Sequence, residues 1–441
     1  MPVQTILTTC LCLLATHAAL ASPTATQSDT PPNIVIILAD DLGIECLSAY
    51  GGASHETPNI NRLAAQGMRF THCFSNPTCS PSRATLLTGR YSFKHGVKRV
   101  IWHEQQHADL YLRTSQPSFA RQLKASGYTT AIAGKWQLSF LHQRNTINDF
   151  GFDTYQCWQI YNQQLEKTRR FHQPHFNRDG EVLAKEITDR YGPDVNADFL
   201  IDFIQTNAEK KKPFLAYYTA LLPHYPLVPT PDSKDQDYEL SDTTGKGDPR
   251  YFTDMVRYLD KNVGRIIKAI DESPAADNTI LIFLADNGTD QLLKNQWGDD
   301  NKWIAGGKGT MTDRGTRVPL IVRWPARIKP GMTNDDLVDF SDLLPTLCEL
   351  TGAALPCQPI HGTSFAPQLL GQPGTPRQWV HIQDYGNRHI RSKDYILTNK
   401  GQLRQTVDLS QAPSKPIKQP TSKAEQAAVK QLEHVFEQLG D

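Results

Sequence analysis

The chain has 441 residues, with 46 lysine and arginine side chains against 46 aspartate and glutamate side chains, so its formal net charge is zero. This balance gives no global attraction to nucleic acid or to an anionic membrane, and we expect no nucleic-acid partner. A chain with this length and 39% hydrophobic residues is too apolar to be disordered, and it favours a large core domain with a smaller second one.

The first residues, 1–21, are predicted to be a signal peptide. The apolar stretch from Ile6 to Ala21 ends in Ala19-Leu20-Ala21, a pattern that signal peptidase cleaves before the next residue. The stretch is too short to span a membrane, and no other run is long enough, so we expect no transmembrane segment. A buried N-terminal helix is the alternative. We therefore expect an exported protein, periplasmic or secreted, with residues 22–32 as a polar leader.

Four apolar runs are predicted to be buried strands. Asn33–Ala39 and Thr279–Ala285 are continuous aliphatic runs, and Thr129–Ala133 and Phe214–Leu222 have the same character. Runs that are apolar on both faces are typical of central strands in a sheet covered by helices.

Segments with apolar residues at helical spacing lie between these runs. They cover residues 114–126, 193–208 and 251–270. Alternating strands and helices predict an α/β fold with a large, mainly parallel sheet flanked by helices.

Polar side chains follow each predicted strand. They are Asp40 and Asp41, Lys135, His224, and Asp286 and Asn287. Because the carboxyl ends of parallel strands meet at one edge of a sheet, neighbouring strands would bring three carboxylates and an amide oxygen together. Such oxygen ligands suit Ca²⁺ or Mg²⁺. Turn formation and helix capping are the alternative roles, but the repetition of the pattern in two distant parts of the chain favours a metal site.

The strongest local signal is Cys79-Ser80-Pro81-Ser82-Arg83, which continues to Leu87-Thr88-Gly89-Arg90. Pro81 suits the first turn of a helix. Cys79 would then lie at the helix start, where the helix dipole and Arg83 favour a negatively charged group. A cysteine nucleophile also needs a general base, and none is nearby in the sequence. A buried thiol beside a structural arginine is the alternative.

Together these motifs resemble those of the type I sulfatases, the formylglycine-dependent branch of the alkaline phosphatase superfamily. The Cys79–Arg83 motif is the most specific of them. The others follow in the order of the family: Asn33–Gly43, Gly134-Lys135-Trp136, Pro223-His224, Ala285–Gly288 and Gly315–Pro325. The resemblance implies a catalytic domain over residues 33–370 and a small subdomain with an antiparallel sheet and a helix over residues 371–441.

The resemblance also implies the chemistry. A maturation enzyme would oxidise Cys79 to formylglycine, an aldehyde, and one hydroxyl of its hydrated form would attack sulfur and displace the alcohol. The second hydroxyl would then lose its proton, so that sulfate is expelled and the aldehyde returns. The implied ligands of a Ca²⁺ ion, with Mg²⁺ as the alternative, are residue 79 together with Asp40, Asp41, Asp286 and Asn287.

Basic residues have implied roles around the sulfate. Arg83 would support the hydrated aldehyde, and Lys135 and Lys308 would bind the sulfate oxygens. Lys308 lies in the glycine-rich segment Gly306-Gly307-Lys308-Gly309. His224 would contact sulfate and help to protonate the departing alcohol.

One position departs from the family pattern. The sequence Gly134-Lys135-Trp136-Gln137 has glutamine where the family has a histidine, generally assigned as the base for the collapse step. Gln137 can contact the nucleophile or substrate through hydrogen bonds, but it cannot accept a proton near neutral pH. Three alternatives follow. Another residue acts as the base, with His95 as a candidate unless that histidine is structural; water accepts the proton; or turnover is weak.

We therefore predict a sulfatase that releases sulfate from a sulfated saccharide, by exo action, with an aryl sulfate ester as a surrogate substrate. Two other functions stay open. One is a phosphomonoester or phosphodiester hydrolase of the same superfamily. The other is a weakly active or non-catalytic binder of sulfated glycans, which the glutamine at position 137 favours.

The C-terminal region is predicted to contain short strands at residues 379–382, 395–398 and 407–409. A helix should follow Ser422, which forms a capping-box pattern with Glu425. Six cysteines remain after the predicted signal peptide, and Cys348 and Cys357 are close enough in sequence for a small disulfide loop; buried free thiols are equally expected.

Overall fold

The computed structural model describes residues 30–102, 111–142, 146–235 and 245–440. Pro32–Asp441 forms one compact unit. The predicted signal peptide and most of the predicted leader lie outside the described residues, and the predicted boundary after residue 370 stays a prediction. No helix in the described part of the chain is both long and apolar enough to cross a membrane.

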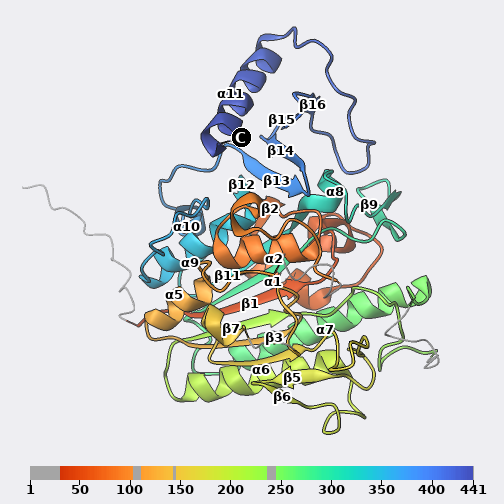
Figure 1. The fold of residues 1–441 in the computed structure, drawn as a ribbon, viewed down its shortest axis with the longest axis vertical. Coiled ribbons are helices and arrows are strands. Elements are labelled where there is room, and N and C mark those ends of the chain that lie inside the picture. Colours follow the sequence, from red (N-terminus) through yellow and green to blue (C-terminus); the bar gives the residue numbers. More distant parts are fainter. Residues whose placement is uncertain (1–29, 103–110, 143–145, 236–244, 441) are drawn as a thin grey trace, which may run out of the picture. The chain divides into compact units, whose positions relative to one another are not determined.

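A ten-stranded sheet forms the centre of this unit, with the strand order β12-β2-β11-β8-β1-β7-β3-β4-β5-β6 (Figure 1). The strands are β1 (Asn33–Ala39), β2 (Met68–Phe74), β3 (Thr129–Gly134), β4 (Thr154–Trp158), β5 (Phe176–Arg178), β6 (Glu181–Val182), β7 (Phe214–Thr219), β8 (Thr279–Ala285), β11 (Arg317–Arg323) and β12 (Met332–Asp339).

The four predicted strands lie side by side in the middle of the sheet, as β8, β1, β7 and β3, and all of them are parallel. Their side chains are buried on both faces, which explains why the runs are continuously apolar. β11 runs antiparallel to β8 and β2, so the sheet is mixed and mostly parallel. The predicted fold class is confirmed.

Helices flank the sheet. α6 packs against β3 and β7 with α7 beside it, and α1 packs against α7 and β11, whereas α2, α5 and α9 form a second group that meets the sheet at β3 (Figure 1). Their bounds are α1 (Pro58–Gln66), α2 (Cys79–Thr88), α5 (Phe119–Ala125), α6 (Gly192–Glu209), α7 (Phe252–Asp271) and α9 (Leu343–Thr351). Shorter helices are α3 (Ser92–His95), α8 (Asp313–Thr316) and α10 (Ala366–Leu369).

Two predicted helices, α6 and α7, are confirmed over nearly their whole length. The third, α5, begins at Phe119, later than predicted. The reason is a cap: Ser118 Oγ accepts hydrogen bonds from Ala120 N at 3.1 Å and Arg121 N at 3.4 Å.

A second, four-stranded antiparallel sheet forms the C-terminal part, with β13 (Val380–Asp384), β14 (Asn387–Arg391), β15 (Tyr395–Thr398) and β16 (Leu403–Gln405) in that order. Helix α11 (Lys423–Leu439) packs on β14 and β15 through Ala428, Leu432 and Val435. The predicted capping box between Ser422 and Glu425 is present.

The predicted strand at residues 407–409 is wrong. β16 ends before this segment, and Leu409 instead packs with Ile44 and Ile304 of the large domain. Its carbonyl oxygen also accepts a hydrogen bond from Arg314 Nε at 2.8 Å. These contacts join the segment to Ile44, Ile304 and Arg314 and draw it away from the small sheet.

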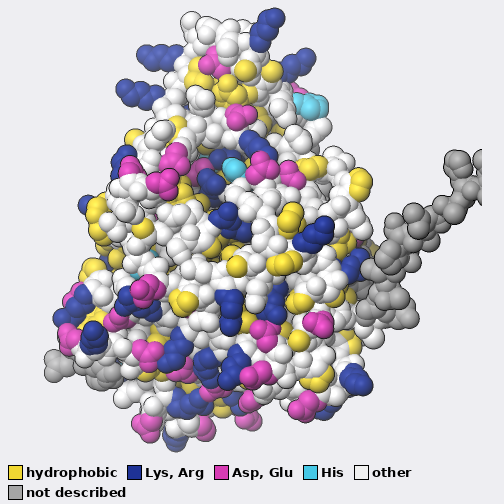
Figure 2. All heavy atoms as spheres, turned by 180° about the vertical axis from the view of Figure 1, so that it is seen from behind, with side chains coloured by type: hydrophobic (Ala, Val, Ile, Leu, Met, Phe, Trp, Pro, Cys, Tyr) yellow, Lys and Arg dark blue, Asp and Glu magenta, His cyan; other side chains and the backbone are white. Residues whose placement is uncertain are grey.

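A two-stranded hairpin, β9 (Lys294–Trp297) and β10 (Lys302–Ala305), precedes the glycine-rich segment at residues 306–309. The cysteines in the described residues are all free, so the suggested disulfide between Cys348 and Cys357 does not form; Cys348 is buried and Cys357 is exposed. On the face shown in Figure 2, basic side chains lie among acidic ones, in keeping with the balanced net charge.

The backbone conformation of Gly134, at the end of β3, leads to a prediction about stability. Gly134 has a φ of +116°, and a Cβ there would lie 1.8 Å from Thr219 O. We expect Gly134→Ala to lower the free energy of unfolding by about 3 kcal/mol or more, as measured by urea denaturation, because both backbone strain and a backbone clash oppose it. Gly127→Ala is the control: its φ is +91°, but nothing lies within 4 Å, so a loss of about 1 kcal/mol is expected. Equal losses would contradict this account.

Candidate active site

Four predicted ligands lie together at the carboxyl edge of the large sheet. Asp40 and Asp41 follow β1, and Asp286 and Asn287 follow β8, the adjacent parallel strand. Asp41 N donates to Asp286 Oδ1 at 3.1 Å, and Asn287 Nδ2 donates to Asp41 Oδ1 at 2.8 Å. All four side chains are buried. The pairing of β1 with β8 thus brings two distant parts of the chain into one acidic centre.

Three basic side chains contact the carboxylates of this centre. Lys135 Nζ lies 2.7 Å from Asp40 Oδ2, and Lys308 Nζ lies 2.5 Å from Asp41 Oδ2. Arg83 Nε donates to Asp286 Oδ2 at 2.9 Å. The structure therefore brings all three predicted basic residues to the centre, each in contact with a carboxylate.

Local backbone structure places the two lysines. Lys135 follows Gly134, whose positive φ suits glycine, and its N–H continues the ladder of β7 by donating to Thr219 O at 2.8 Å. The loop of Lys308 is held by Lys308 N, which donates to Thr289 O at 2.9 Å, and by Gly309 N, which donates to Pro77 O at 2.8 Å. The second contact attaches the lysine loop directly to the segment that precedes Cys79.

Cys79 is the first residue of α2, and it is buried. Burial raises the pKa of its thiol, although Lys135 and Lys308 act in the opposite direction. The expectation that this position favours a negative charge is therefore wrong for the unmodified thiol. Arg83, which that expectation invoked, is bound to Asp286 and to Lys135 O. A neutral buried thiol is a poor nucleophile.

His224 lies at the edge of the acidic centre. Its Nε2 is 3.6 Å from Asp41 Oδ2, and its Nδ1 is 2.7 Å from Tyr225 O, an acceptor to which Nδ1–H donates. Burial, with Lys308 as the next contribution, lowers the pKa of His224 well below its usual range, so the ring is neutral. Asp40, Asp41 and His224 together place potential ligand atoms within 4.8 Å of one another.

Two observations show that the centre suits a cation. Asn287 Oδ1 is buried and has no hydrogen-bond partner among the described residues. Burial also raises the pKa values of Asp41 and Asp286, and the neighbouring carboxylate of Asp40 raises them further. A divalent cation would give the amide oxygen a partner and would stabilise the ionised carboxylates.

Gln137 lies next to the start of α2. Its main-chain carbonyl oxygen accepts a hydrogen bond from Ser80 Oγ at 3.1 Å, and its Nε2 donates to Ile101 O at 3.2 Å. Its Oε1 is buried and lacks a hydrogen-bond partner within the described part of the chain. The amide oxygen is therefore an available acceptor beside the residue that follows Cys79.

His95 is not a substitute base. Its Nδ1 accepts a hydrogen bond from Val97 N at 3.1 Å, so Nε2 holds the proton and donates to Thr85 Oγ1, also at 3.1 Å. Burial lowers the pKa of His95 to about 3. Nε2 thus joins α3 to the middle of α2, and Nδ1 holds the backbone just after α3, as in a structural histidine.

Arg170 is a site residue that the sequence reasoning missed. Its guanidinium lies 4.6 Å from the centre of the Trp158 ring, and its NH2 is 3.1 Å from His224 Nδ1. Because Nδ1 donates to Tyr225 O, this second approach is a charge contact and not a hydrogen bond. Its positive charge is one of the causes that lower the pKa of His224. Arg170 lies in an irregular segment next to Arg169, and nothing in the sequence distinguishes one from the other.

Comparisons with known proteins agree with this geometry. A family model described as Sulfatase matches residues 32–353, and one described as N-sulphoglucosamine sulphohydrolase, C-terminal, matches residues 302–405. The chain belongs to the sulfatase family. This sulfatase is 32% identical to human arylsulfatase A over 392 residues, which cover 84% of this chain and 74% of that one.

Other relatives are sulfatases with named sugar substrates. The sulfatase is 30% identical over 390 residues to the N-acetylgalactosamine-6-sulfatase of Canis lupus familiaris, covering 82% of this chain and 70% of that one. It is 26% identical over 481 residues to the N-acetylglucosamine-6-O-sulfatase of Bacteroides thetaiotaomicron, covering 86% of this chain and 80% of that one. The crystal structure of Ps i-CgsB shares its fold, with a TM-score of 0.74, 24% identity and coverage of 93% of each chain. The sequence-based family assignment is confirmed, and the chain is an enzyme that hydrolyses sulfate esters.

The contacts of Arg83 predict a large effect on stability. Removing this buried charge leaves Asp286 and Asp40 without their shared cation, so we expect Arg83→Met to lower the free energy of unfolding by about 3–5 kcal/mol in urea denaturation. Arg190→Met is the matched control, because its pair with Asp198 is largely exposed, and a loss below about 1 kcal/mol is expected. Similar losses for the two variants would contradict the central role of Arg83.

Proposed function

We propose that this sulfatase releases sulfate from a sulfated carbohydrate, with formylglycine formed from Cys79 and with a divalent cation, Ca²⁺ or alternatively Mg²⁺. The observation that supports it best is the free Asn287 Oδ1 among three buried carboxylates, in a centre whose charges act directly on Cys79. The ligands would be Asp40, Asp41, Asp286, Asn287 and residue 79. The cation would supply positive charge beside the nucleophile, and the hydrated formylglycine would supply the attacking hydroxyl.

The two lysines are proposed to bind the sulfate. In the structure their ammonium groups are directed at Asp40 and Asp41, the same carboxylates that would hold the cation. Once the cation neutralises those carboxylates, Lys135 and Lys308 can donate to the sulfate oxygens. Fixed ammonium groups in a buried site stabilise the charge that develops on those oxygens during cleavage.

His224 is proposed to protonate the departing alcohol. A neutral imidazole with its proton on Nδ1 has no proton to give from Nε2. An anionic sulfate bound beside the ring would raise its pKa and favour protonation at Nε2. The hydrogen bond from Nδ1 to Tyr225 O would keep the ring orientation fixed while this proton is transferred.

Gln137 is proposed to orient the nucleophile without serving as its base. Its buried Oε1 can accept a hydrogen bond from a hydroxyl group on residue 79, but an amide does not take up the proton. Because both ring nitrogens of His95 are engaged elsewhere, we propose water as the acceptor of the proton in the collapse step. The presence of Gln137, where the family has a histidine, also supports the alternative of a weakly active or non-catalytic binder of sulfated glycans.

The substrate class and the location are also proposals. The names of two relatives specify sulfated amino sugars, and that of a third specifies aryl sulfates. We propose a sulfated saccharide as the natural substrate and an aryl sulfate as a practical assay compound. Residues 1–21 would direct export to the periplasm or outside the cell, and a formylglycine-generating enzyme would be the maturation partner.

The activity is tested by measuring sulfate release from a panel of defined sulfated saccharides, together with mass spectrometry of the peptide that contains Cys79. We expect formylglycine in that peptide, sulfate release by the native protein, and at least a thousandfold loss of activity in Cys79→Ala. Cys357→Ala, which removes an exposed thiol, should retain full activity. An unmodified thiol with phosphate ester hydrolysis, or glycan binding without release, would overturn the proposal.

Metal binding is tested by heat denaturation with and without added Ca²⁺. We expect Ca²⁺ to raise the melting temperature, because a ligand at 100 times its Kd stabilises the native state by about 2.7 kcal/mol. Asn287→Ala should lose most of this increase because it removes the free amide oxygen. Asn61→Ala, on α1, should keep it. An unchanged increase in Asn287→Ala would exclude this residue as a ligand.

A further inference from the structure

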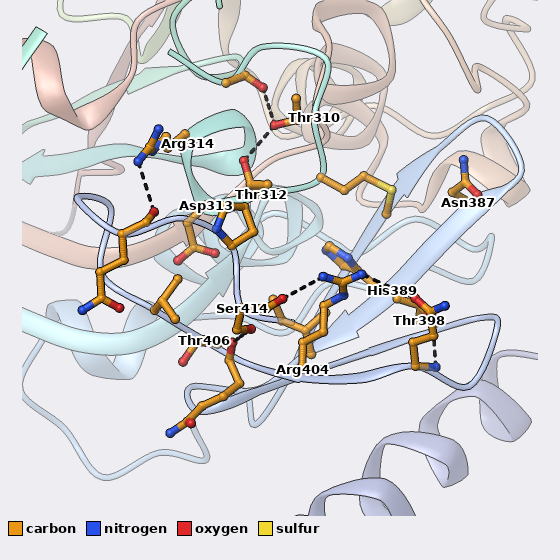
Figure 3. A pocket seen from close by; sticks show the side chains of 18 of the residues that line it. Thr310, Thr312, Asp313, Arg314, Asn387, His389, Thr398, Arg404, Thr406 and Ser414 are labelled. Carbon is orange, nitrogen blue, oxygen red and sulfur yellow. Dashed lines mark hydrogen bonds between the residues drawn. The ribbon is translucent and has the colours of Figure 1, made fainter. Parts of the chain in front are cut away.

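A second cavity lies between the lysine loop and the C-terminal sheet (Figure 3). Its volume is about 500 Å³. Residues 306–314, strands β14 to β16 and residues 406–414 form its walls, and we call it the junction cavity. Gly306 and Gly307 line it, and the next residue, Lys308, reaches Asp41. One short loop thus contributes both to the acidic centre and to the junction cavity.

The lining of the junction cavity is rich in side chains that form hydrogen bonds with hydroxyl groups. They are Thr310, Thr312, Asn387, Thr398, Asn399, Gln402, Gln405, Thr406, Gln411 and Ser414. The aliphatic side chains of Met311, Ile396, Val407 and Leu409 also line the junction cavity, so apolar surface lies between the polar groups. Amides and hydroxyls can both donate and accept, which suits the many hydroxyl groups of a saccharide.

The charges in the lining favour an anionic ligand. Four cationic side chains face two carboxylates there: Arg314, Arg388, Lys400 and Arg404 against Asp313 and Asp408. Asp313 is already neutralised by Arg391, whose NH2 lies 2.7 Å from its Oδ2. The junction cavity therefore has a surplus of positive charge in a protein whose overall charge is balanced.

Two of these arginines hold the wall in place. Arg404 NH1 donates to Ser414 O at 2.7 Å, and Arg314 Nε donates to Leu409 O at 2.8 Å. Figure 3 shows Arg404 and Ser414 joined in this way across the cavity wall. The wall formed by residues 409–414 is thus ordered by contacts within the protein, while Lys400 remains exposed to meet a ligand.

His389 gives an independent indication of a ligand. It lines the junction cavity, is 4% exposed, and its Nε2 has no hydrogen-bond partner among the described residues. Burial lowers the pKa of His389 to about 3, so the ring is neutral and can pair with a hydroxyl group. A buried polar atom without a partner is costly, and a bound sugar hydroxyl would satisfy it.

We infer that the junction cavity binds a sulfated sugar unit of the same substrate chain, next to the unit that loses its sulfate. This inference rests on the proposed function, and it makes the preferred substrate an oligosaccharide with at least two anionic units. The neutral lining groups would bind hydroxyls, and the exposed Lys400 would bind the second sulfate. The shared loop would place this second unit close to Lys308.

The test compares two substrates in three variants. Lys400→Glu reverses a charge of the junction cavity, and Asn387→Trp adds bulk to its wall. We expect each to lower kcat/KM for a multiply sulfated oligosaccharide about tenfold or more, mainly through KM, and to change kcat/KM for a small aryl sulfate less than twofold. Lys430→Glu, on α11 and outside the cavity lining, is the matched control and should change neither.

The outcomes separate this inference from the proposed function. Unchanged kinetics of both cavity variants on the oligosaccharide would overturn the inference while sulfatase activity stands. Equal losses on both substrates would also overturn it, because they would indicate an effect on the reaction itself. If the native protein releases no sulfate, calorimetric titration with the oligosaccharide still tests the inference. Binding at least tenfold weaker in Lys400→Glu, but unchanged in Lys430→Glu, would support the site. Equal affinity of the native protein and Lys400→Glu for the oligosaccharide would reject it.

Discussion

Three buried carboxylates at one sheet edge repel one another, and the fold has to supply positive charge to hold them together. Asp40, Asp41 and Asp286 are each in contact with a cationic side chain: a lysine for the first two and Arg83 for the third. Burial of these groups in a region of low dielectric strengthens both the repulsion and the attraction. α2, the turn after β3 and the lysine loop supply these three cationic side chains.

The central strands meet this requirement because they are parallel neighbours. β8 and β1 end side by side, so the residues that follow them share one small volume. The turn after β3 then needs a residue without a side chain, since Gly134 lies against the carbonyl oxygen of Thr219. Lys135 is the first residue able to leave the sheet there, and its ammonium group reaches Asp40. Backbone packing and charge balance therefore act on adjacent residues.

The C-terminal sheet has more than a supporting role. The C-terminal region contacts α8, which follows the lysine loop, through the ion pair between Asp313 and Arg391 of β14 and through the hydrogen bond from Arg314 to Leu409 O, beyond the end of β16. These contacts limit the positions that the lysine loop can adopt. They also form part of the wall of the junction cavity.

Departures from the family pattern have local consequences only. Gln137 keeps its backbone and amide contacts to Ser80 and Ile101, so the start of α2 remains supported although the position cannot act as a base. His95, the nearest histidine along the chain after α2, uses Nε2 to bond Thr85 of α2 and Nδ1 to bond the backbone of Val97. His95 therefore offers no base in place of the family histidine, and this is the reason for proposing water as the proton acceptor.

Local sequence patterns were sufficient for the strands Asn33–Ala39 and Thr279–Ala285, for α6 and α7, and for the capping box of α11, because burial on both faces, helical spacing and caps are properties of neighbouring residues. They also indicated which polar residues end the strands. Only the tertiary structure decided that these residues meet, that Arg83 binds Asp286, that Arg170 lies against His224, and that residues 407–409 pack on Ile44. Such pairings depend on strand order and on competition between distant surfaces, which no short stretch of sequence contains.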